Sequence, residues 1–270
     1  MTAYMDGYLK QNMDIALSVI KKDWDFIFIV DGRERAGKSV LAQQLAHYCD
    51  PTFVLDRVVF TPDQFKREVL AATQYQAIVY DEAYSGLNSR QAMSQLNRSI
   101  NGMLTRIGRK NLFLFIVLPS FFDLDKYVAL WRGAALLHVY TAENFKRGFF
   151  AFYNYDKKKD LYVNGKKWYS YKTPRPNFIG RFTDGYVVDR ADYEQKKADG
   201  EDELQGKDAD DNTKRAVEEH LFMRLLPIEL PHSKKVEILQ IPTSTYFTKL
   251  RKLRENGDID IYSKIPSKTV

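Results

Sequence analysis

Residues 32–39 read GRERAGKS and match the pattern G-x-x-x-x-G-K-S. The apolar run WDFIFIV before them is typical of a buried strand, and VLAQQLAHYC after them has the apolar spacing of a helix. Gly32 and Gly37 allow backbone angles that turn several N–H groups toward one set of phosphates at a helix N-terminus. In this context the pattern predicts a site for a nucleoside triphosphate. A glycine turn with an incidental lysine is the alternative.

The residue types also suggest roles in a reaction. Lys38 is expected to reach the β- and γ-phosphates, and the Ser39 hydroxyl is expected to hold Mg²⁺. The strand IVYDE (residues 78–82) adds Asp81, which can hold the Mg²⁺ shell, and Glu82, which can orient and deprotonate an attacking water. The Asp-Glu pair favours ATP hydrolysis over phosphoryl transfer to a small molecule. Two solvated acids at a strand end are the alternative.

These assignments give a list of expected site residues. Nucleotide contacts are expected from Gly32, Ala36, Gly37, Lys38, Ser39 and Val40, metal contacts from Ser39 and Asp81, and catalysis from Lys38 and Glu82.

Composition limits the setting in which the chain works. Its 270 residues carry a formal net charge of +6 and one cysteine, Cys49. A single cysteine excludes a disulfide framework and fits a reducing, cytoplasmic environment. The longest apolar run, LFLFIVLP, is too short to cross a bilayer, and the first residues lack a signal-peptide pattern. We therefore expect a soluble cytoplasmic protein without a membrane segment, located in the host cytoplasm if it is viral. The positive charge favours an anionic partner.

Apolar strands alternate with helices over the first half of the chain. Strands are expected at 24–30, 53–60, 76–83, 111–120 and 133–140, with helices between them. This order predicts an α/β fold with a mostly parallel sheet and helices on both faces. In residues 149–171 aromatic and polar residues alternate around Asn164-Gly165, which predicts a β-hairpin added at the sheet edge. Its tyrosines and lysines could contact nucleic acid, but a plain amphipathic hairpin is the favoured interpretation.

The loop GRERAGKS, the strand IVYDE and the later strand LFLFIVLPS together resemble the additional-strand, RecA-like class of P-loop ATPases. Within it the chain is most similar to HerA/FtsK-type DNA-pumping ATPases and to Zot-like ATPases of phages and mobile elements. The resemblance covers residues 20–145. It implies that the LFLFIVLPS strand lies between the strands of the two motifs, and that subunits form rings, commonly hexamers. Ser120 stands where related pumps place a polar residue, often Gln, and is a candidate sensor of the γ-phosphate.

Ring ATPases of this class place an arginine of one subunit in the site of the next. Arg106 and Arg109, at the end of a long amphipathic helix, are the first candidates for this catalytic role, and Arg132 is the third. A solvated surface position or a structural salt bridge is the alternative for each. Residues 83–122 contain five basic residues and no acid. Steps of eight residues rotate by about 80° on a helix, so these residues as a set do not form a single face.

An acidic stretch divides the chain. Residues 199–211, DGEDELQGKDADD, hold seven acids and one lysine and predict a flexible linker. We therefore assign an ATPase domain to residues 1–195, a linker to 196–211 and a small domain to 212–270. The pattern of helices and of a final strand in the small domain resembles a winged helix-turn-helix. The alternative is a three-helix domain that binds protein.

In a winged helix-turn-helix the later helix would enter the major groove. Its expected DNA contacts are Ser244, Thr245 and Tyr246 to base edges and Lys249, Arg251 and Lys252 to phosphates.

The leading functional hypothesis is an ATP-hydrolysing motor that translocates or packages viral or mobile-element DNA, with double-stranded DNA as the partner and a homo-oligomeric ring as the active form. One alternative is an ATP-controlled DNA-binding switch in replication or partition. Another is an assembly ATPase that acts on protein. A metabolic kinase fits least, because Glu82 is suited to activating water.

Overall fold

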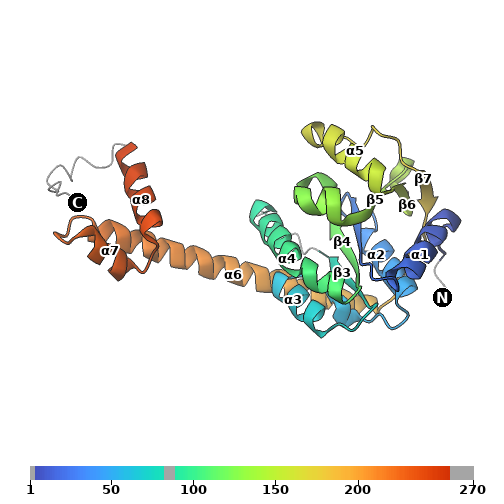
Figure 1. The fold of residues 1–270 in the computed structure, drawn as a ribbon, viewed down its shortest axis with the longest axis horizontal. Helices are drawn as coiled ribbons and strands as arrows, with labels where there is room; N and C mark the ends of the chain where they lie inside the picture. Colours follow the sequence, from blue (N-terminus) through green and yellow to red (C-terminus); the bar gives the residue numbers. More distant parts are fainter. Residues whose placement is uncertain (1–3, 82–88, 256–270) are drawn as a thin grey trace. The chain divides into compact units, whose positions relative to one another are not determined.

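The computed structural model describes residues 4–81 and 89–255. These described residues form two compact units, one that ends at residue 203 and one that starts at residue 204 (Figure 1). The first unit is built on a seven-stranded sheet with the order β2-β3-β4-β1-β5-β6-β7. Its strands are β1 (Phe26–Gly32), β2 (Val58–Val59), β3 (Ala77–Asp81), β4 (Phe113–Leu118), β5 (Gly133–Tyr140), β6 (Phe149–Tyr153) and β7 (Phe178–Arg181). Strands β1 to β5 pair in parallel, and β6 and β7 pair antiparallel at one edge. The predicted α/β fold with a mostly parallel sheet is confirmed.

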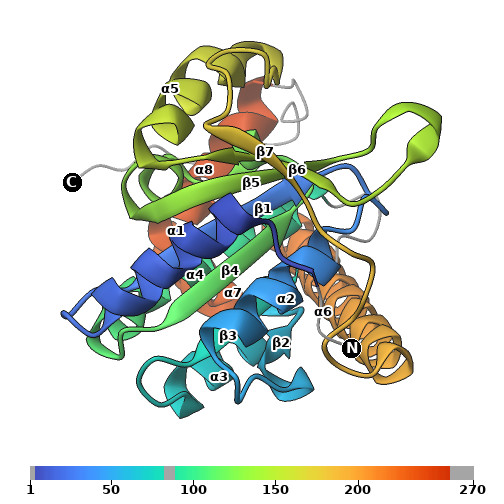
Figure 2. The same ribbon diagram turned by 90° about the vertical axis from the view of Figure 1, so that its right-hand side faces the viewer.

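Helices cover both faces of this sheet, as the continuous apolar strands require. On one face α3 (Pro62–Ala71), α4 (Ser89–Arg109) and α5 (Tyr155–Gly165) share a buried cluster with strand side chains such as Ile29 and Leu114. The other face is covered by α1 (Gly7–Ile20) and α2 (Lys38–Cys49), as Figure 2 shows. Strand β4 lies between β1 and β3, which is the order that the resemblance implies.

Local signals explain why several helices begin where they do. The Asp6 side chain accepts hydrogen bonds from the first N–H groups of α1. Thr61 accepts one from the backbone N–H of Gln64, with Pro62 in the first turn of α3. Between β4 and β5, where a longer helix is expected, the chain forms a 3₁₀ helix at Phe121–Asp123 and a π-helical turn at Val128–Arg132.

The hairpin predicted around Asn164-Gly165 is wrong, because residues 155–165 form helix α5 and only β6 of that segment is a strand. Asn154 caps α5 by accepting from the Lys157 N–H at 3.1 Å. The buried face of α5 includes Lys158, whose amino group donates to the Ala129 carbonyl. A lysine at a buried position breaks the apolar spacing by which a helix is recognised.

The predicted flexible linker is also wrong, since α6 is one helix from Arg190 to Leu225 and includes the acidic stretch. In the first unit this helix is anchored to β2 and its surroundings. Tyr193 packs on Phe60 with ring centroids 5.6 Å apart, and Lys196 Nζ donates to the Leu55 carbonyl at 2.9 Å. Six of the thirteen residues of the acidic stretch are good helix formers, and the helix continues through the stretch from its anchored start.

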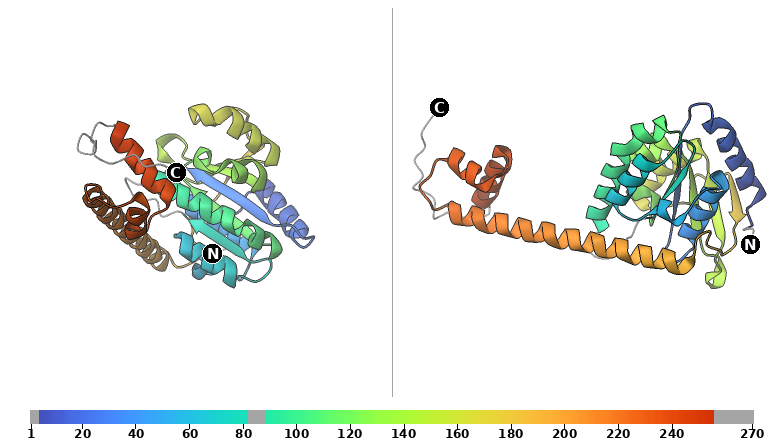
Figure 3. Two further views of the ribbon diagram at one scale, coloured as in Figure 1. Left: turned by 60° about the vertical axis from the view of Figure 1, so that its left-hand side comes forward. Right: turned by 90° about the horizontal axis from the view of Figure 1, so that it is seen from below.

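The second unit contains the end of α6, α7 (His232–Leu239) and α8 (Thr243–Glu255), drawn in orange to red in Figure 3. Its core consists of Phe222, Leu226, Leu239, Tyr246 and Leu250. The predicted helices of the small domain are present, and the predicted wing at residues 258–270 lies outside the described residues. Within the described ranges, no helix has both the length and the apolar content of a membrane span.

The core of the second unit makes a stability prediction. Tyr246 is 1% exposed, its ring meets Phe222 edge-on at 5.4 Å, and its hydroxyl lies 2.9 Å from His232 Nδ1. Tyr246→Ala is expected to destabilise this unit by about 3 kcal/mol, because it leaves a cavity and removes the packing of the ring. The matched control is Phe247→Ala, because Phe247 is 47% exposed.

Two signals separate the units in a urea denaturation. All three tryptophans, Trp24, Trp131 and Trp168, belong to the first unit, so their fluorescence reports that unit, whereas far-UV circular dichroism reports helices of both. Tyr246→Ala should lower the midpoint of part of the dichroism change and leave the fluorescence midpoint in place. Equal effects of Tyr246→Ala and Phe247→Ala would contradict this packing.

Candidate functional site

The loop after β1 has the geometry that a phosphate site requires. Gly32 has a φ of 137° and Gly37 a φ of 103°, values that favour glycine. A Cβ on Gly32 would lie 2.0 Å from the Val139 carbonyl oxygen of the neighbouring strand β5. Helix α2 starts at Lys38 with Gly37 as its N-cap, which has no side chain to accept from the first N–H groups of the helix. These N–H groups and the positive end of the helix dipole suit an anion.

Lys38 is partly buried inside this loop. Its ammonium donates to the carbonyl oxygens of Gly32 at 2.7 Å and Arg33 at 3.0 Å. Burial lowers the pKa of Lys38, and the nearby carboxylates of Asp81 and Asp31 oppose that effect. The lysine is therefore a donor held by loop carbonyls beside the first N–H groups of α2, and an ammonium so placed suits phosphate oxygens.

Other predicted loop residues contribute through the backbone. Ala36 is 0% exposed and Val40 is 4% exposed, so their side chains belong to the core and only their main-chain atoms can serve a ligand.

Asp81 ends β3 at the same edge of the sheet and is buried. Its carboxylate accepts a hydrogen bond of 2.6 Å from the hydroxyl of Tyr193, near the start of α6. Ser39 lies near the same hydroxyl, so one tyrosine is close to both predicted metal ligands. Burial raises the pKa of Tyr193, and the Asp81 charge adds to this, so the phenol stays protonated and donates. Glu82 lies outside the described residues.

The segment between β7 and α6 crosses the phosphate loop. The Phe182 ring lies 3.1 Å from where a Cβ on Gly37 would be. Gln44 of α2 donates to the carbonyls of Thr183 and Gly185, each at 2.9 Å. We call residues 182–193 the aromatic strap, because Phe182, Tyr186 and Tyr193 lie along it. It fixes α6 next to the loop through side-chain contacts that the sequence pattern does not signal.

A buried carboxylate lies on the other side of the loop. Asp31, directly before Gly32, accepts from the Phe121 N–H at 2.8 Å, from the Tyr171 hydroxyl and from His138 Nδ1 at 2.9 Å. An ionised carboxylate only accepts, so the hydrogen in the last contact belongs to the imidazole. Ser120 lies near the Tyr171 hydroxyl, so this predicted sensor is beside the Asp31 cluster.

Sequence reasoning missed Asp31, His138, Tyr171, Phe182 and Tyr193. Two of them could be recognised in the sequence as polar residues in apolar strands. Asp31 ends the apolar run FIFIVD, and His138 interrupts the apolar strand GAALLHVY. A polar residue in a buried strand needs a partner, and strand pairing sets Asp31 opposite His138. The tyrosines gave no comparable signal.

Arg106 and Arg109 are not part of this site. Both lie at the end of α4, which leads into the start of β4, whereas the phosphate loop follows the end of the parallel strand β1. A strand of this length spans about 20 Å, so neither arginine reaches the loop of its own chain. Arg132 is held by Asp25, with Nη2 to Oδ2 at 2.6 Å, as expected of a structural ion pair.

The predicted DNA contacts on α8 divide into two groups. Ser244, Arg251 and Lys252 are exposed and Thr245 is half-buried. The assignment of Tyr246 to base edges is wrong, because its side chain packs in the core of the second unit. Lys249 Nζ is 2.9 Å from carboxylate oxygens of both Glu218 and Glu219, so its charge is already paired.

Comparison of the chain with protein-family models, with curated proteins and with solved structures finds no match.

The contact between Tyr193 and Asp81 makes a testable prediction. Tyr193→Phe keeps the ring against Phe60 and removes the hydroxyl that competes with a metal for the Asp81 carboxylate. The Mg²⁺ concentration that gives half-maximal ATP binding is expected to fall by about tenfold, since a hydrogen bond to a charged group contributes about 1.5 kcal/mol. This Mg²⁺ concentration is measured by titrating Mg²⁺ at a fixed ATP concentration and recording the heat of binding by calorimetry.

Tyr186→Phe is the matched control, because the Tyr186 ring lies 5.1 Å from that of Tyr193 in the same strap. It should leave the Mg²⁺ titration unchanged. A higher Mg²⁺ requirement in Tyr193→Phe would contradict competition and would show that this hydroxyl helps to hold the metal.

Proposed function

We propose that this chain is an ATP-hydrolysing DNA motor of the RecA-like P-loop class. The observation that carries the proposal is the phosphate loop. Its glycines at positive φ, its uncapped helix N-terminus and Lys38 converge at the carboxyl edge of a parallel sheet. The position of β4 between β1 and β3 supports the class. Ligands of open α/β sheets bind at this edge, where loops leave the strands.

The residues present fit a nucleoside triphosphate with Mg²⁺. Backbone N–H groups of residues 36–40 would hold the phosphates, Lys38 would pair with the β- and γ-phosphate oxygens, and Ser39 and Asp81 would hold the metal. Bound Mg²⁺ would neutralise charge that develops on the phosphate oxygens. In this proposal Glu82 orients and deprotonates the attacking water, and Ser120 contacts the γ-phosphate.

DNA is the proposed partner of the second unit, in which α7 and α8 form the helix-turn-helix of a winged-helix domain. The exposed face of α8 carries Ser244, Thr248, Arg251 and Lys252, which follow one another at helical spacing. Hydroxyls and cations on one helix face suit phosphate and base-edge contacts, and the ion pair of Arg251 with Glu255 there, at 3.7 Å, is exposed. Tyr246 packs in the core on the opposite side of α8, so it is not among the proposed DNA contacts.

Assembly into a homo-oligomeric ring, commonly a hexamer in the class that the chain resembles, is part of the proposal. Because Arg106 and Arg109 lie at the sheet edge opposite their own phosphate loop, a catalytic role for either requires a neighbouring subunit. We also propose that the protein acts in the cytoplasm.

One observation favours an ATP-controlled DNA-binding switch as the second candidate. Tyr193, which is hydrogen-bonded to Asp81, belongs to α6, and the same helix contributes Phe222 to the core of the second unit. A metal ion bound at Asp81 would therefore act on the start of α6 through the Tyr193 side chain. A switch would use this link to set DNA binding without repeated turnover.

ATP hydrolysis by the full chain, with and without long double-stranded DNA, tests the motor. Turnover is expected to rise severalfold with DNA. Lys38→Ala should abolish turnover by removing the phosphate contact, and Glu82→Gln should bind ATP but lower kcat by on the order of 100-fold or more, as expected for loss of a general base. Slow turnover that DNA does not change would favour the switch instead.

The α8 surface is tested by charge removal. The double variant Arg251→Gln with Lys252→Gln should weaken DNA binding and reduce its dependence on salt, by roughly 0.9 in the log–log slope for each phosphate that the variant no longer neutralises. Lys214→Gln with Lys234→Gln removes the same charge from exposed positions of the same unit outside α8. Fluorescence anisotropy with labelled duplex measures both. Equal weakening in the two double variants would show that only net charge matters.

A further inference from the structure

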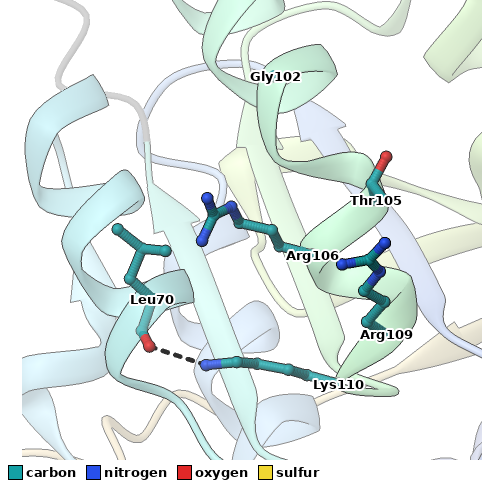
Figure 4. Close-up of a pocket in the computed structure, with 6 residues that line it drawn as sticks. All are labelled: Leu70, Gly102, Thr105, Arg106, Arg109 and Lys110. Carbon is teal, nitrogen blue, oxygen red and sulfur yellow. Dashed lines mark hydrogen bonds between the residues drawn. The ribbon is translucent and has the colours of Figure 1, made fainter.

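A basic pocket of about 370 Å³ opens between α3 and α4 (Figure 4). It is lined by Leu70, Gly102, Thr105, Arg106, Arg109 and Lys110. Among these described lining residues three are basic and none is acidic. The ammonium of Lys110 already has hydrogen-bond partners, because it donates to the carbonyls of Val69, Leu70 and Ala72 at the end of α3.

The two arginines of the pocket differ from Lys110 in their contacts with the described residues. Within the described part of the chain, no ion pair or hydrogen bond engages the guanidinium of Arg106 or of Arg109. The Arg106 side chain extends from α4 toward the side of α3 in the view of Figure 4. Two unpaired guanidiniums around one pocket repel each other and offer several N–H donors to an anion, which would relieve that repulsion.

The pocket continues into a polar stripe along α4. Arg98, Gly102, Thr105 and Arg109 are exposed and lie at i, i+4, i+7 and i+11, within about 60° of one another on the helix. The stripe from Arg98 to Arg109 is roughly 16 Å long at 1.5 Å per residue. Residues 83–122, which include α4, contain no acid in the sequence. The set of all five basic residues is spread around the helix, but this subset shares a face.

An extended cationic stripe suits a polyanion, whose negative charges recur at regular intervals. A terminal phosphate of a nucleotide on a neighbouring subunit needs one guanidinium at one point, whereas Arg98, Arg106 and Arg109 are distributed along three turns. Gly102 leaves the middle of the stripe without a side chain, and a Cβ built there has no atom within 4 Å. A polymer backbone can therefore approach the helix closely between the cations.

We propose that the α4 stripe, with the Arg106/Arg109 pocket at its end, binds backbone phosphates of DNA. This site is separate from α8, and the proposal rests on the proposed function, since it gives the first unit its own contact with the DNA that a motor would move. The contact carries no sequence information, because phosphates are alike at every step.

Gly102 permits a test that leaves the arginines intact. Gly102→Glu adds a carboxylate to the stripe, Gly102→Gln adds a neutral side chain of the same size, and both are better helix formers than glycine. With full-length protein and long double-stranded DNA, Gly102→Glu should raise the DNA concentration for half-maximal ATPase stimulation severalfold. Turnover at saturating DNA and turnover without DNA should be unchanged, and Gly102→Gln should resemble the unmodified protein.

The pocket itself is tested by Arg106→Gln with Arg109→Gln. The log–log slope of DNA affinity against salt should fall by roughly 2, from two phosphate contacts at about 0.9 each. Unchanged DNA affinity with a lowered kcat would overturn the proposal and assign the arginines to a neighbouring subunit's nucleotide. Unchanged DNA affinity and unchanged kcat would overturn it in favour of an acidic protein segment as the occupant.

The same measurements separate this inference from the proposed function. If the unmodified protein binds DNA and the α4 variants bind equally well, only the α4 site is wrong. If the unmodified protein hydrolyses ATP but neither binds DNA nor responds to it, the motor and the α4 site both fail.

Discussion

The buried carboxylate of Asp31 is the interaction on which the candidate site depends. It is 0% exposed, and its two oxygens take hydrogen bonds from the Phe121 N–H, the Tyr171 hydroxyl and His138 Nδ1. Phe121 follows β4 and His138 belongs to β5, and these two strands flank β1. Removing the partners of a buried charge costs about 3 kcal/mol or more, so the ends of these strands are held in register. The glycine loop starts at the next residue, and this register sets its geometry.

The same edge of the sheet brings together groups that are far apart in sequence. Strand pairing places Gly32 against Val139, where only a glycine fits, and the aromatic strap brings Tyr193 to Asp81 from more than one hundred residues away. The arginines of α4 lie at the opposite edge. The first unit thus separates the glycine loop at one end of its strands from the arginines of α4 at the other.

The sequence predicted what local chemistry determines. The helix after the glycine loop and the strands β1, β3, β4 and β5 depend on residue type and spacing within a few positions, and these predictions agree with the structure. Of the strand expected at 53–60, only Val58–Val59 is a strand. Helix α5 was missed because its buried face includes Lys158, whose charge is satisfied by a carbonyl of the π-helical turn. Helix α6 was missed because it is anchored by Tyr193, Lys196 and Gly200 through contacts with residues 55–60, which no local pattern shows.

The candidate site shows the same division. Lys38, Ser39 and Asp81 were found from motifs, whereas Tyr193 and Tyr171 depend on how distant segments pack. Tyr246 was misassigned because helix spacing places it beside exposed residues, and only the packing of Phe222 against it decides that it is buried. Residue type alone cannot distinguish an aromatic that stabilises a helix from one that meets a ligand.

The most direct test of the central claim is a calorimetric titration of the full chain with ATP, in the presence and absence of Mg²⁺, beside Lys38→Ala. The account predicts saturable binding of one nucleotide per chain that Mg²⁺ strengthens. It also predicts that Lys38→Ala loses this binding while its circular dichroism and tryptophan fluorescence stay unchanged. Failure of the unmodified chain to bind, or equal binding by Lys38→Ala, would contradict the assignment of residues 32–39 as a nucleotide site.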